Sequence, residues 1–367
     1  DAAVEAGAPK DCIQWIENPG LDKTSALINN DGVAITLATG GAGMVHAAYS
    51  TGKPALGVGP GNVPAYFEKS CDIRRSVNDL VVSKTFDNGM ICASEQAVIC
   101  DKEIYDQVKE EFERNRAYFV PSKDIKKLED FVINKEKQSV NPDIVGQSAE
   151  WIAEHAGINV PEGTKLLIAE CKGVGEKYPL TREKLSPVLA FIKAESTEDG
   201  FEKSKQMLEF GGMGHSASIH THGSNNDLIE DFAVKMQASR ILVNSPSSIG
   251  GIGDLYNEMT PSLTLGCGSY GKNSISENVS VKHLINVKTI AKRRNNMQWQ
   301  KLPSKLYFEK NSVRYLEKMP DVEKVFIVTD QGMVEHGLVA KVVDVLRKRS
   351  NQVVYEIFSD VEPDPTT

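Results

Sequence analysis

The stretch QAVICDKEIYDQVKEEFERN, residues 96–115, joins a short apolar run to a longer charged run. Residues 96–101 are apolar and partly β-branched, which is typical of a β-strand. Residues 102–115 mix apolar side chains with Glu and Lys, which predicts an amphipathic helix. The stretch therefore predicts a strand that is followed at once by a helix.

The same alternation continues on both sides of this stretch. A second helix is predicted at 197–210, between apolar runs that we interpret as strands. Strands that alternate with helices form α/β units around mainly parallel sheets, so we expect an α/β fold. The predicted strands are 32–39, 96–101, 164–170, 186–194, 216–222 and 239–245.

A second unit is predicted near the end of the chain. Residues 323–330 and 352–361 have the composition of strands, and residues 337–349 between them have that of a helix. A single β-α-β unit is too small to bury a complete α/β core. Because the chain also opens without an initiating Met, we expect it to be truncated at both ends.

Composition argues against several classes of partner. The formal charge of −8 and the pI near 5.5 argue against nucleic acid, because phosphate binding requires a basic face. No window approaches the roughly 18 uncharged apolar residues of a membrane span, and no signal peptide is visible. The six cysteines include no CxxC pair, which predicts reduced thiols in the cytoplasm rather than a disulfide framework or a zinc site.

A glycine-rich turn follows the first predicted strand, within LATGGAGMVHAAY at 37–49. Thr39, Gly40 and Gly43 lie where the strand ends and a helix begins at about Met44. Glycines at such a turn let a ligand approach the backbone, and the free N–H groups of a helix start favour phosphate. A tight turn also requires glycine for steric reasons alone, so both interpretations stay open at this point.

A further glycine-rich segment, GVGPGNVPAYFEK at 57–69, includes Gly59. Its glycines and prolines predict irregular backbone, which either passes close to a ligand or forms a crossover between domains. The segment carries no carboxylate before Glu68.

Cys92 lies in FDNGMICASEQ at 86–96, among small side chains. A nucleophilic thiolate needs access, nearby N–H groups or positive charge, and room for a substrate carbon. Small neighbours on a turn provide that room. A cysteine that fills a tight core position is the alternative, but the surrounding residues favour the nucleophile.

The segment GGMGHSASIHTH at 211–222 places His215 on a glycine-rich turn before a strand. There it is a candidate for proton transfer near pH 7, or a histidine that is hydrogen-bonded within the turn. His220 and His222 alternate along the strand without a third ligand, so we interpret them as structural. Glu183 precedes another strand and is a candidate either for binding ribose hydroxyls or for capping exposed backbone.

These segments, in this order, resemble the aldehyde dehydrogenase superfamily and, within it, the acylating branch that uses coenzyme A. FIVTDQGMVEHG and VEPDPT near the end resemble the opening of the iron-dependent alcohol dehydrogenases. The order implies a fusion of two enzymes. The first resemblance rests on SKTFDNGMICASEQ at 83–96, EKLSPVLAF at 183–191, GGMGHSAS at 211–218, GGIGDLYN at 250–257 and SLTLGCGSYGKNSISENV at 262–279.

The resemblance implies a Rossmann-type nucleotide domain and an α/β catalytic domain. The implied boundaries are 1–70 for the last part of the NAD-binding domain, 71–265 for the catalytic domain, 266–300 for an oligomerisation segment and linker, and 301–367 for the first β-α-β unit of the iron-dependent alcohol dehydrogenase domain.

The resemblance also implies a reaction in which the Cys92 thiolate adds to an aldehyde. The thiohemiacetal loses a hydride to NAD, and the resulting thioester passes its acyl group to the thiol of coenzyme A. In fermentation the implied net direction runs from acetyl-CoA and NADH to acetaldehyde, which the second half reduces to ethanol. Water-using relatives carry a glutamate base where this chain has Gly57 and Val58, so hydrolysis of the thioester lacks its base.

Residue by residue, the resemblance implies that His215 handles the thiol proton and that Glu183 holds the nicotinamide ribose. The oxyanion-hole asparagine and the iron ligands of the family are expected outside this sequence, so no metal ligand is assigned and the isolated chain is expected to be nearly inactive. The expected cofactor-binding residues are Thr39, Gly40, Gly43, Gly59, Glu183 and, in the second half, Asp330 at the carboxyl end of a strand.

The resemblance implies a homo-oligomer, with dimers that assemble into helical filaments, and residues 276–294 resemble the segment that pairs subunits. Two alternatives remain. One is a monofunctional acylating dehydrogenase with an unrelated tail, against which the match at 326–337 argues. The other is a chain that serves mainly in filament assembly.

Overall fold

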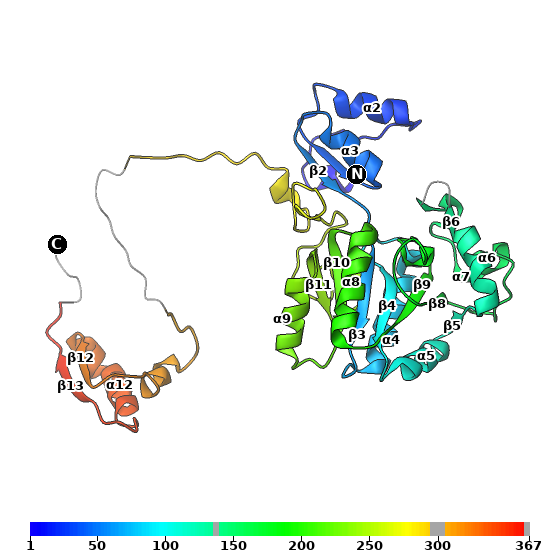
Figure 1. The fold of residues 1–367 in the computed structure, drawn as a ribbon. Coiled ribbons are helices and arrows are strands. Elements are labelled where there is room, and N and C mark those ends of the chain that lie inside the picture. Colours follow the sequence, from blue (N-terminus) through cyan, green and yellow to red (C-terminus); the bar gives the residue numbers. More distant parts are fainter. Residues whose placement is uncertain (135–138, 294–304, 363–367) are drawn as a thin grey trace. The chain divides into compact units, whose positions relative to one another are not determined.

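The computed structural model describes residues 1–134, 139–293 and 305–362. The chain divides into two compact units, Asp1–Val287 and Lys288–Thr367, which are considered separately (Figure 1). Within the described ranges, no helix combines the length and the apolar character that crossing a membrane requires.

The first unit is built around a seven-stranded sheet whose paired neighbours are all parallel. The strand order is β11-β10-β3-β4-β9-β8-β5, so the chain crosses over between parallel strands (Figure 1). This confirms the predicted α/β fold. The strands are β3 (Val63–Phe67), β4 (Glu95–Asp101), β5 (Ala117–Phe119), β8 (Leu166–Cys171), β9 (Val188–Ala194), β10 (Gly214–His220) and β11 (Ala238–Val243).

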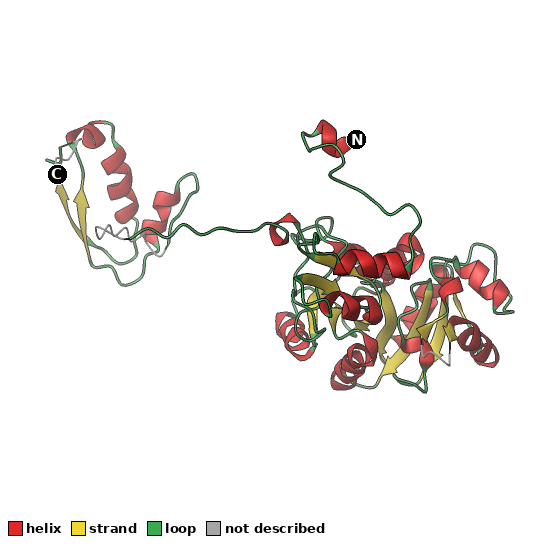
Figure 2. Cartoon of the chain, turned by 90° about the horizontal axis from the view of Figure 1, so that it is seen from above, coloured by secondary structure: helices red, strands yellow, loops and turns green. Residues whose placement is uncertain are grey.

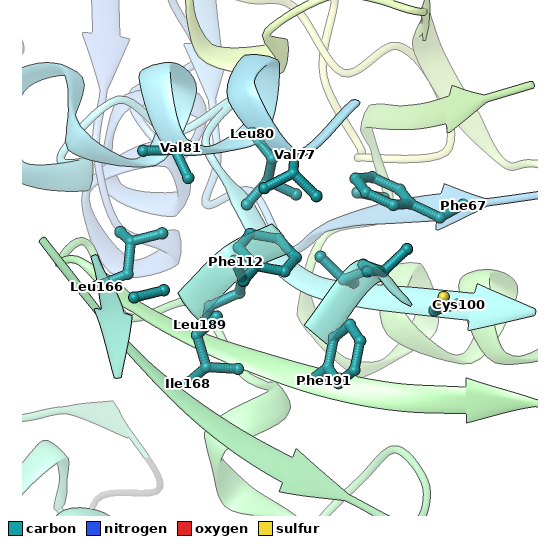
Figure 3. Close-up of a cluster of buried hydrophobic side chains, with 14 of the residues drawn as sticks. Phe67, Val77, Leu80, Val81, Cys100, Phe112, Leu166, Ile168, Leu189 and Phe191 are labelled. Carbon is teal, nitrogen blue, oxygen red and sulfur yellow. The ribbon is translucent and has the colours of Figure 1, made fainter. Parts of the chain in front are cut away.

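Helices cover both faces of this sheet (Figure 2). Side chains alternate along each strand, so Phe67 packs in the cluster on one face and its neighbour Tyr66 in the cluster on the other. Figure 3 shows the first cluster, in which Phe112 lies against strand side chains such as Phe191. The helices are α4 (Ile73–Thr85) and α5 (Tyr105–Arg114) on the first face, and α8 (Thr197–Gly211) and α9 (Asn226–Lys235) on the second.

A third apolar cluster lies beside β8 and β9. It is formed largely by the segment between β5 and β8, and Leu128 and Ile152 are fully buried in it. The elements of this segment are α6 (Ser122–Val132), β6 (Ile133–Asn134), β7 (Ser139–Val140), η2 (Pro142–Ile144) and α7 (Ala149–His155).

Before the main sheet, the chain forms a smaller parallel pair of strands, β1 (Thr36–Thr39) and β2 (Ala55–Val58), joined by α3 (Ala42–Tyr49). The strand predicted at 32–39 is therefore too long at its start. Two further helices, α1 (Ala2–Glu5) and α2 (Leu21–Asn29), precede this pair.

The structure corrects two expectations about the segment at 57–69. This segment was expected to be irregular, but β2 ends at Val58 and β3 spans Val63–Phe67, so its irregular parts are residues 59–62 and 68–69. Strand β3 pairs with β4 and β10 in the main sheet. The division between the smaller strand pair and the main sheet therefore falls between β2 and β3, a few residues before the expected boundary at residue 70.

The second unit contains the predicted β-α-β arrangement. Strands β12 (Lys324–Val328) and β13 (Val354–Phe358) pair in parallel, and α12 (Leu338–Leu346) lies between them in sequence. Two shorter elements accompany them, η5 (Ser312–Glu317) and α11 (Gln331–Glu335). The expected boundary at residue 300 falls within 294–304, outside the described residues.

The segment between the two units differs from its expected form. Residues 276–294 were expected to resemble a subunit-pairing strand. In the described part of this segment, up to residue 293, the chain forms the short helix η4 (Val281–His283) and an isolated bridge from Asn278 to Leu265, but no strand.

Candidate functional site

Cys92 lies in the turn between η1 (Phe86–Gly89) and β4. Gly89 has a φ of +74°, and a side chain there would meet the carbonyl oxygen of Ser186 at 2.7 Å, so this turn requires glycine. A backbone hydrogen bond of 2.8 Å from Ser94 to Ile91 closes the turn around the cysteine. Of the six cysteines, Cys92 is partly exposed, Cys12 is exposed and the other four are buried.

Gly61 connects three of the predicted site residues. A Cβ atom at this position would lie 2.1 Å from the carbonyl oxygen of Cys92 and 3.2 Å from Cγ of the His215 ring. The backbone N–H of Gly61 donates a 2.9 Å hydrogen bond to Oε1 of Glu183. The structure therefore brings Cys92, His215 and Glu183 together around one glycine.

His215 lies within β10, not in a turn ahead of the strand as the sequence suggested, and it is fully buried. Its Nδ1 atom is 3.0 Å from the hydroxyl of Ser216, whereas its buried Nε2 atom has no hydrogen-bond partner in the described structure. Burial, together with the charge of Arg240, lowers the pKa of His215 to about 3. The imidazole is therefore neutral at physiological pH, which does not favour a proton relay near pH 7.

The electrostatic environment keeps Cys92 protonated in this structure. Burial raises the pKa of the Cys92 thiol to about 12, and the charge of Glu183 contributes in the same direction. Arg240 is a positive group that opposes this rise. Formation of the thiolate is therefore favoured by Arg240 and disfavoured by an ionised Glu183.

Glu183 is itself perturbed. Burial raises the pKa of its carboxyl group to about 7, against the effects of the Gly61 N–H and of two buried lysines, Lys84 and Lys184. The carboxyl group is thus close to half ionised at neutral pH, so its charge beside Cys92 can change with a small change in surroundings.

The smaller strand pair holds the predicted glycine-rich turn. Thr39 ends β1, and its hydroxyl lies 3.1 Å from that of Thr264. A Cβ atom on Gly43 or Gly59 would meet nothing within 4 Å, whereas one on Gly40 would lie 3.2 Å from the sulfur of Met44. Packing within this chain therefore does not explain the glycines at 43 and 59.

Gly57 has a different explanation. A Cβ atom there would lie 2.7 Å from both Tyr49 and Val45. Neighbouring Val58 is fully buried. Packing therefore excludes a larger side chain at 57, including the glutamate that water-using relatives were expected to carry in this region.

The remaining candidates have local contacts of their own. Asp330 caps α11 in the second unit, where its carboxylate accepts a 3.0 Å hydrogen bond from the backbone N–H of Met333. His220 is buried, with its ring centroid 4.7 Å from that of Phe67. His222 lies beyond the end of β10, 2.7 Å from the hydroxyl of Ser224. Among the described residues, no group of three or more His, Cys, Asp or Glu side chains is arranged to hold a metal ion.

Sequence reasoning missed two residues, Gly61 and Arg240. Arg240 is 4% exposed, on β11 next to the strand of His215. The signal for Arg240 is an arginine inside the apolar run SRILVNS, since a buried arginine needs partners. No comparable signal distinguishes Gly61 from its glycine-rich neighbours.

Comparisons with known proteins point to one family. The sequence model of the aldehyde dehydrogenase family matches residues 1–253. The aldehyde-alcohol dehydrogenase of Streptococcus pneumoniae is 58% identical over 372 residues, and the match covers 100% of this chain but 42% of that protein. The chain therefore spans less than half the length of this curated relative.

Solved structures of aldehyde dehydrogenases are similar to this chain as well. An acetylating aldehyde dehydrogenase from Geobacillus thermoglucosidasius is similar with a TM-score of 0.77 at 43% identity, over 82% of this chain and 65% of that one. A propionaldehyde dehydrogenase from Rhodopseudomonas palustris, solved with bound CoA and an acylated cysteine, has a TM-score of 0.66 at 26% identity, over 74% of this chain and 60% of that one.

Proposed function

Because this chain belongs to the aldehyde dehydrogenase family, we propose that it carries the catalytic site of a coenzyme A-acylating aldehyde dehydrogenase. In this proposal the Cys92 thiolate adds to an aldehyde to form a thiohemiacetal. Loss of a hydride leaves an acyl thioester on the sulfur, and the thiol of coenzyme A takes the acyl group while Cys92 regains its thiol. The reverse direction converts acetyl-CoA to acetaldehyde.

The observation that carries this proposal is the arrangement around Gly61. A partly exposed cysteine, a carboxyl group with a raised pKa and a buried histidine with an unpartnered ring nitrogen meet at one glycine. Groups with perturbed pKa values that gather beside a cysteine in this way mark a candidate functional site.

The residues of the smaller strand pair fit a dinucleotide. Gly43 and Gly59 leave open the space that a Cβ atom would fill. Helix α3 begins at Ala42, within the glycine-rich turn and two residues earlier than expected, and the free N–H groups of a helix start favour phosphate. We therefore propose that Thr39, Gly40, Gly43 and Gly59 contact NAD and that Glu183 accepts hydrogen bonds from its ribose. When bound, NAD accepts the hydride.

Transfer to a thiol rather than to water is supported by the region of Gly57. Its tight packing against Tyr49 and Val45 excludes a carboxylate side chain there. Without a general base at this position, water is a poorer nucleophile at neutral pH, whereas a thiol is partly ionised and intrinsically more reactive. This difference favours coenzyme A as the acyl acceptor.

For the second unit we propose the beginning of an iron-dependent alcohol dehydrogenase, in which Asp330 lies near a nucleotide. The support is that the aldehyde-alcohol dehydrogenase match covers this whole chain, including the tail. We accordingly propose that the complete protein works in the cytoplasm as a bifunctional enzyme that forms ethanol, and that residues 1–367 alone have little activity. No iron ligand is assigned.

A role in assembly is favoured by one observation. Residues Val281, Leu284, Ile285 and Val287, between 51% and 78% exposed, form an apolar run at the end of the first unit. We propose that this run pairs subunits into filaments. Substitution of Ile285 and Val287 by Asp is expected to shorten filaments in electron micrographs, with normal filaments counting against the proposal.

The proposed function is tested by Cys92→Ser in the complete protein. The variant is expected to lose CoA-dependent NADH oxidation while alcohol dehydrogenation survives. Cys171→Ser is the matched control, because Cys171 is buried in an apolar cluster away from the site. Retention of CoA-dependent turnover by Cys92→Ser would exclude the proposed nucleophile.

A further inference from the structure

Arg240 connects the site to its surroundings through a complete set of hydrogen bonds. A guanidinium group has five N–H donors, and five acceptors surround this one. Nη2 donates to the carbonyl oxygens of His215 at 3.2 Å and Gly266 at 2.6 Å. Nη1 donates to the carbonyl oxygen of Ser276 at 3.5 Å and to Oδ1 of Asn278 at 3.3 Å. The fifth donor, Nε, lies 3.3 Å from the hydroxyl oxygen of Ser216.

The contact with Arg240 limits the hydrogen bonds that the Ser216 hydroxyl can make. Because Nε of Arg240 can only donate, the oxygen of Ser216 accepts. The same oxygen lies 3.0 Å from Nδ1 of His215. Ser216 is fully buried, and these are the two side-chain partners of its hydroxyl in the described structure.

Two arrangements of the proton between Ser216 and His215 are geometrically open. If Nδ1 carried a proton, the Ser216 oxygen would accept twice, and its own O–H would have no acceptor in a fully buried position. If the Ser216 O–H donates to Nδ1, the Arg240 guanidinium, the Ser216 hydroxyl and Nδ1 are all satisfied, and the N–H at Nε2 is the one group left without a partner in the described structure. The first arrangement leaves two buried polar groups without a partner, the Ser216 O–H and Nε2, whereas the second leaves only Nε2. Each such group is costly, so the second arrangement is favoured.

We propose that Arg240 and Ser216 are positioning residues that hold His215 as the neutral tautomer with its proton on Nε2. His215 then offers a hydrogen-bond donor, not a proton acceptor, at the site beside Gly61 and Cys92. This inference rests on the proposed function for its chemical meaning and revises the expected handling of the thiol proton. The buried Nε2 atom is then the one donor of this group without a partner, and a substrate bound at the site is the partner that we assign to it.

A hydrogen-bond donor at this position suits a reaction in which negative charge develops on the oxygen of the acyl group or on a sulfur atom. A hydrogen bond from Nε2 stabilises either the oxygen of a tetrahedral intermediate or the thiolate of departing coenzyme A, without transfer of the proton. The fixed charge of Arg240 supports the same polarity. Among the described residues it has no carboxylate within ion-pair distance, and its recorded partners are neutral oxygen atoms.

The tautomer can be measured directly in the chain of residues 1–367. With histidine labelled by ¹⁵N, two-bond correlation spectra distinguish a proton on Nε2 from one on Nδ1, and His215→Gln identifies the signal by its loss. We expect a neutral ring protonated at Nε2. A ring protonated at Nδ1, or at both nitrogens near neutral pH, would overturn the inference. This result does not depend on acylation of Cys92, so it can fail while the proposed function stands.

A matched pair of serine variants tests the positioning role. Ser216→Ala removes the donor to Nδ1, so the His215 signals are expected to show a mixture of tautomers. In the complete protein, kcat is expected to fall about tenfold, as the loss of one net hydrogen bond predicts, with KM for NADH unchanged. Ser218→Ala is the control, because Ser218 is buried on the same strand and contacts His220 instead. An unchanged His215 tautomer in Ser216→Ala, or an equal loss in both variants, would overturn the inference.

Discussion

Cys92 is surrounded by groups of opposite effect on its thiol. Burial raises the pKa of the thiol most; among the charged neighbours, the carboxyl group of Glu183 raises it further and Arg240 lowers it. Since Arg240 is permanently charged and Glu183 titrates near neutral pH, Glu183 is the variable member of the pair. The protonation of Glu183 therefore modulates the pKa of the Cys92 thiol, which burial raises most.

This balance predicts that Glu183→Gln activates Cys92. Removal of the negative charge lowers the pKa of the thiol, and each unit of pKa corresponds to about tenfold more thiolate. Alkylation of Cys92 by iodoacetamide at mildly alkaline pH is expected to speed up severalfold, up to about tenfold. The measurement requires a Cys12→Ser background, because Cys12 is exposed and reacts as well.

The matched control for this experiment is Glu95→Gln. Glu95 is also buried, and burial likewise raises the pKa of its carboxyl group to about 7, but Glu95 is not among the groups that shift the Cys92 thiol. Equal alkylation rates in the two variants would mean that Glu183 has no specific influence on the nucleophile.

A second prediction at this scale concerns Gly61. In Gly61→Ala the new methyl group would meet the carbonyl oxygen of Cys92, so the turn must move. We expect a loss of about 1–3 kcal/mol in the free energy of unfolding, as for other overpacked sites, together with loss of Cys92 acylation. Gly59→Ala is the control, since nothing lies within 4 Å of its Cβ position, and it is expected to remain stable. A Gly61→Ala protein as stable as the control would contradict the proposed packing.

At the scale of elements, β10 carries two buried histidines with lowered pKa values, His215 and His220. Burial, followed by the charge of Arg75, lowers the pKa of His220 to about 3. The unfolded chain binds a proton at this residue below about pH 6.5, whereas the folded chain does not. The stability that neutral His220 contributes is therefore present above this pH and is lost as the pH falls.

The direction of this pKa shift predicts how the stability of His220→Gln depends on pH. Between about pH 7.5 and about pH 5.5, the wild type is expected to lose about 1 kcal/mol more unfolding free energy than the variant, measured with urea. The comparison must be made between variants, because buried Glu95 and Glu183, whose pKa values are raised, gain stability over the same acid range. Parallel pH profiles for the two proteins would contradict the assignment.

The sequence predicts most elements of the main sheet because its strands are continuous apolar runs. The strand predicted at 96–101 corresponds to β4 at Glu95–Asp101. Strand β3 was missed for a physical reason. It contains Pro64, which argues against an interior strand. The structure accommodates this residue with a shift of register between Val63 and Pro64, an irregularity that no local pattern indicates.

The residues of the candidate site could be predicted in part, because local sequence selects single residues but not the contacts between them. Cys92, His215 and Glu183 could each be selected from local composition and from the resemblance to a known family. Their meeting at Gly61 depends on contacts between segments far apart in sequence, such as the hydrogen bond from Gly61 to Glu183. Arg240 was missed because its role lies in its partners, which come from three separate segments.

At the scale of the whole molecule, the two units differ in the functional residues that they contain. The first contains the family match and the residues around Cys92. The second contains Asp330, whose observed role is to cap a helix. Chemistry proposed for the complete protein therefore divides between the units, and the thioester step belongs to the first.

The most direct test is the mass of the Cys92 peptide after the complete protein is mixed with acetyl-CoA in the absence of NADH and quenched in acid. The account predicts that this peptide gains one acetyl group, that hydroxylamine removes it, and that Cys92→Ser shows no such gain. An unmodified Cys92 peptide from a preparation that still converts acetyl-CoA to acetaldehyde when NADH is added would contradict the account.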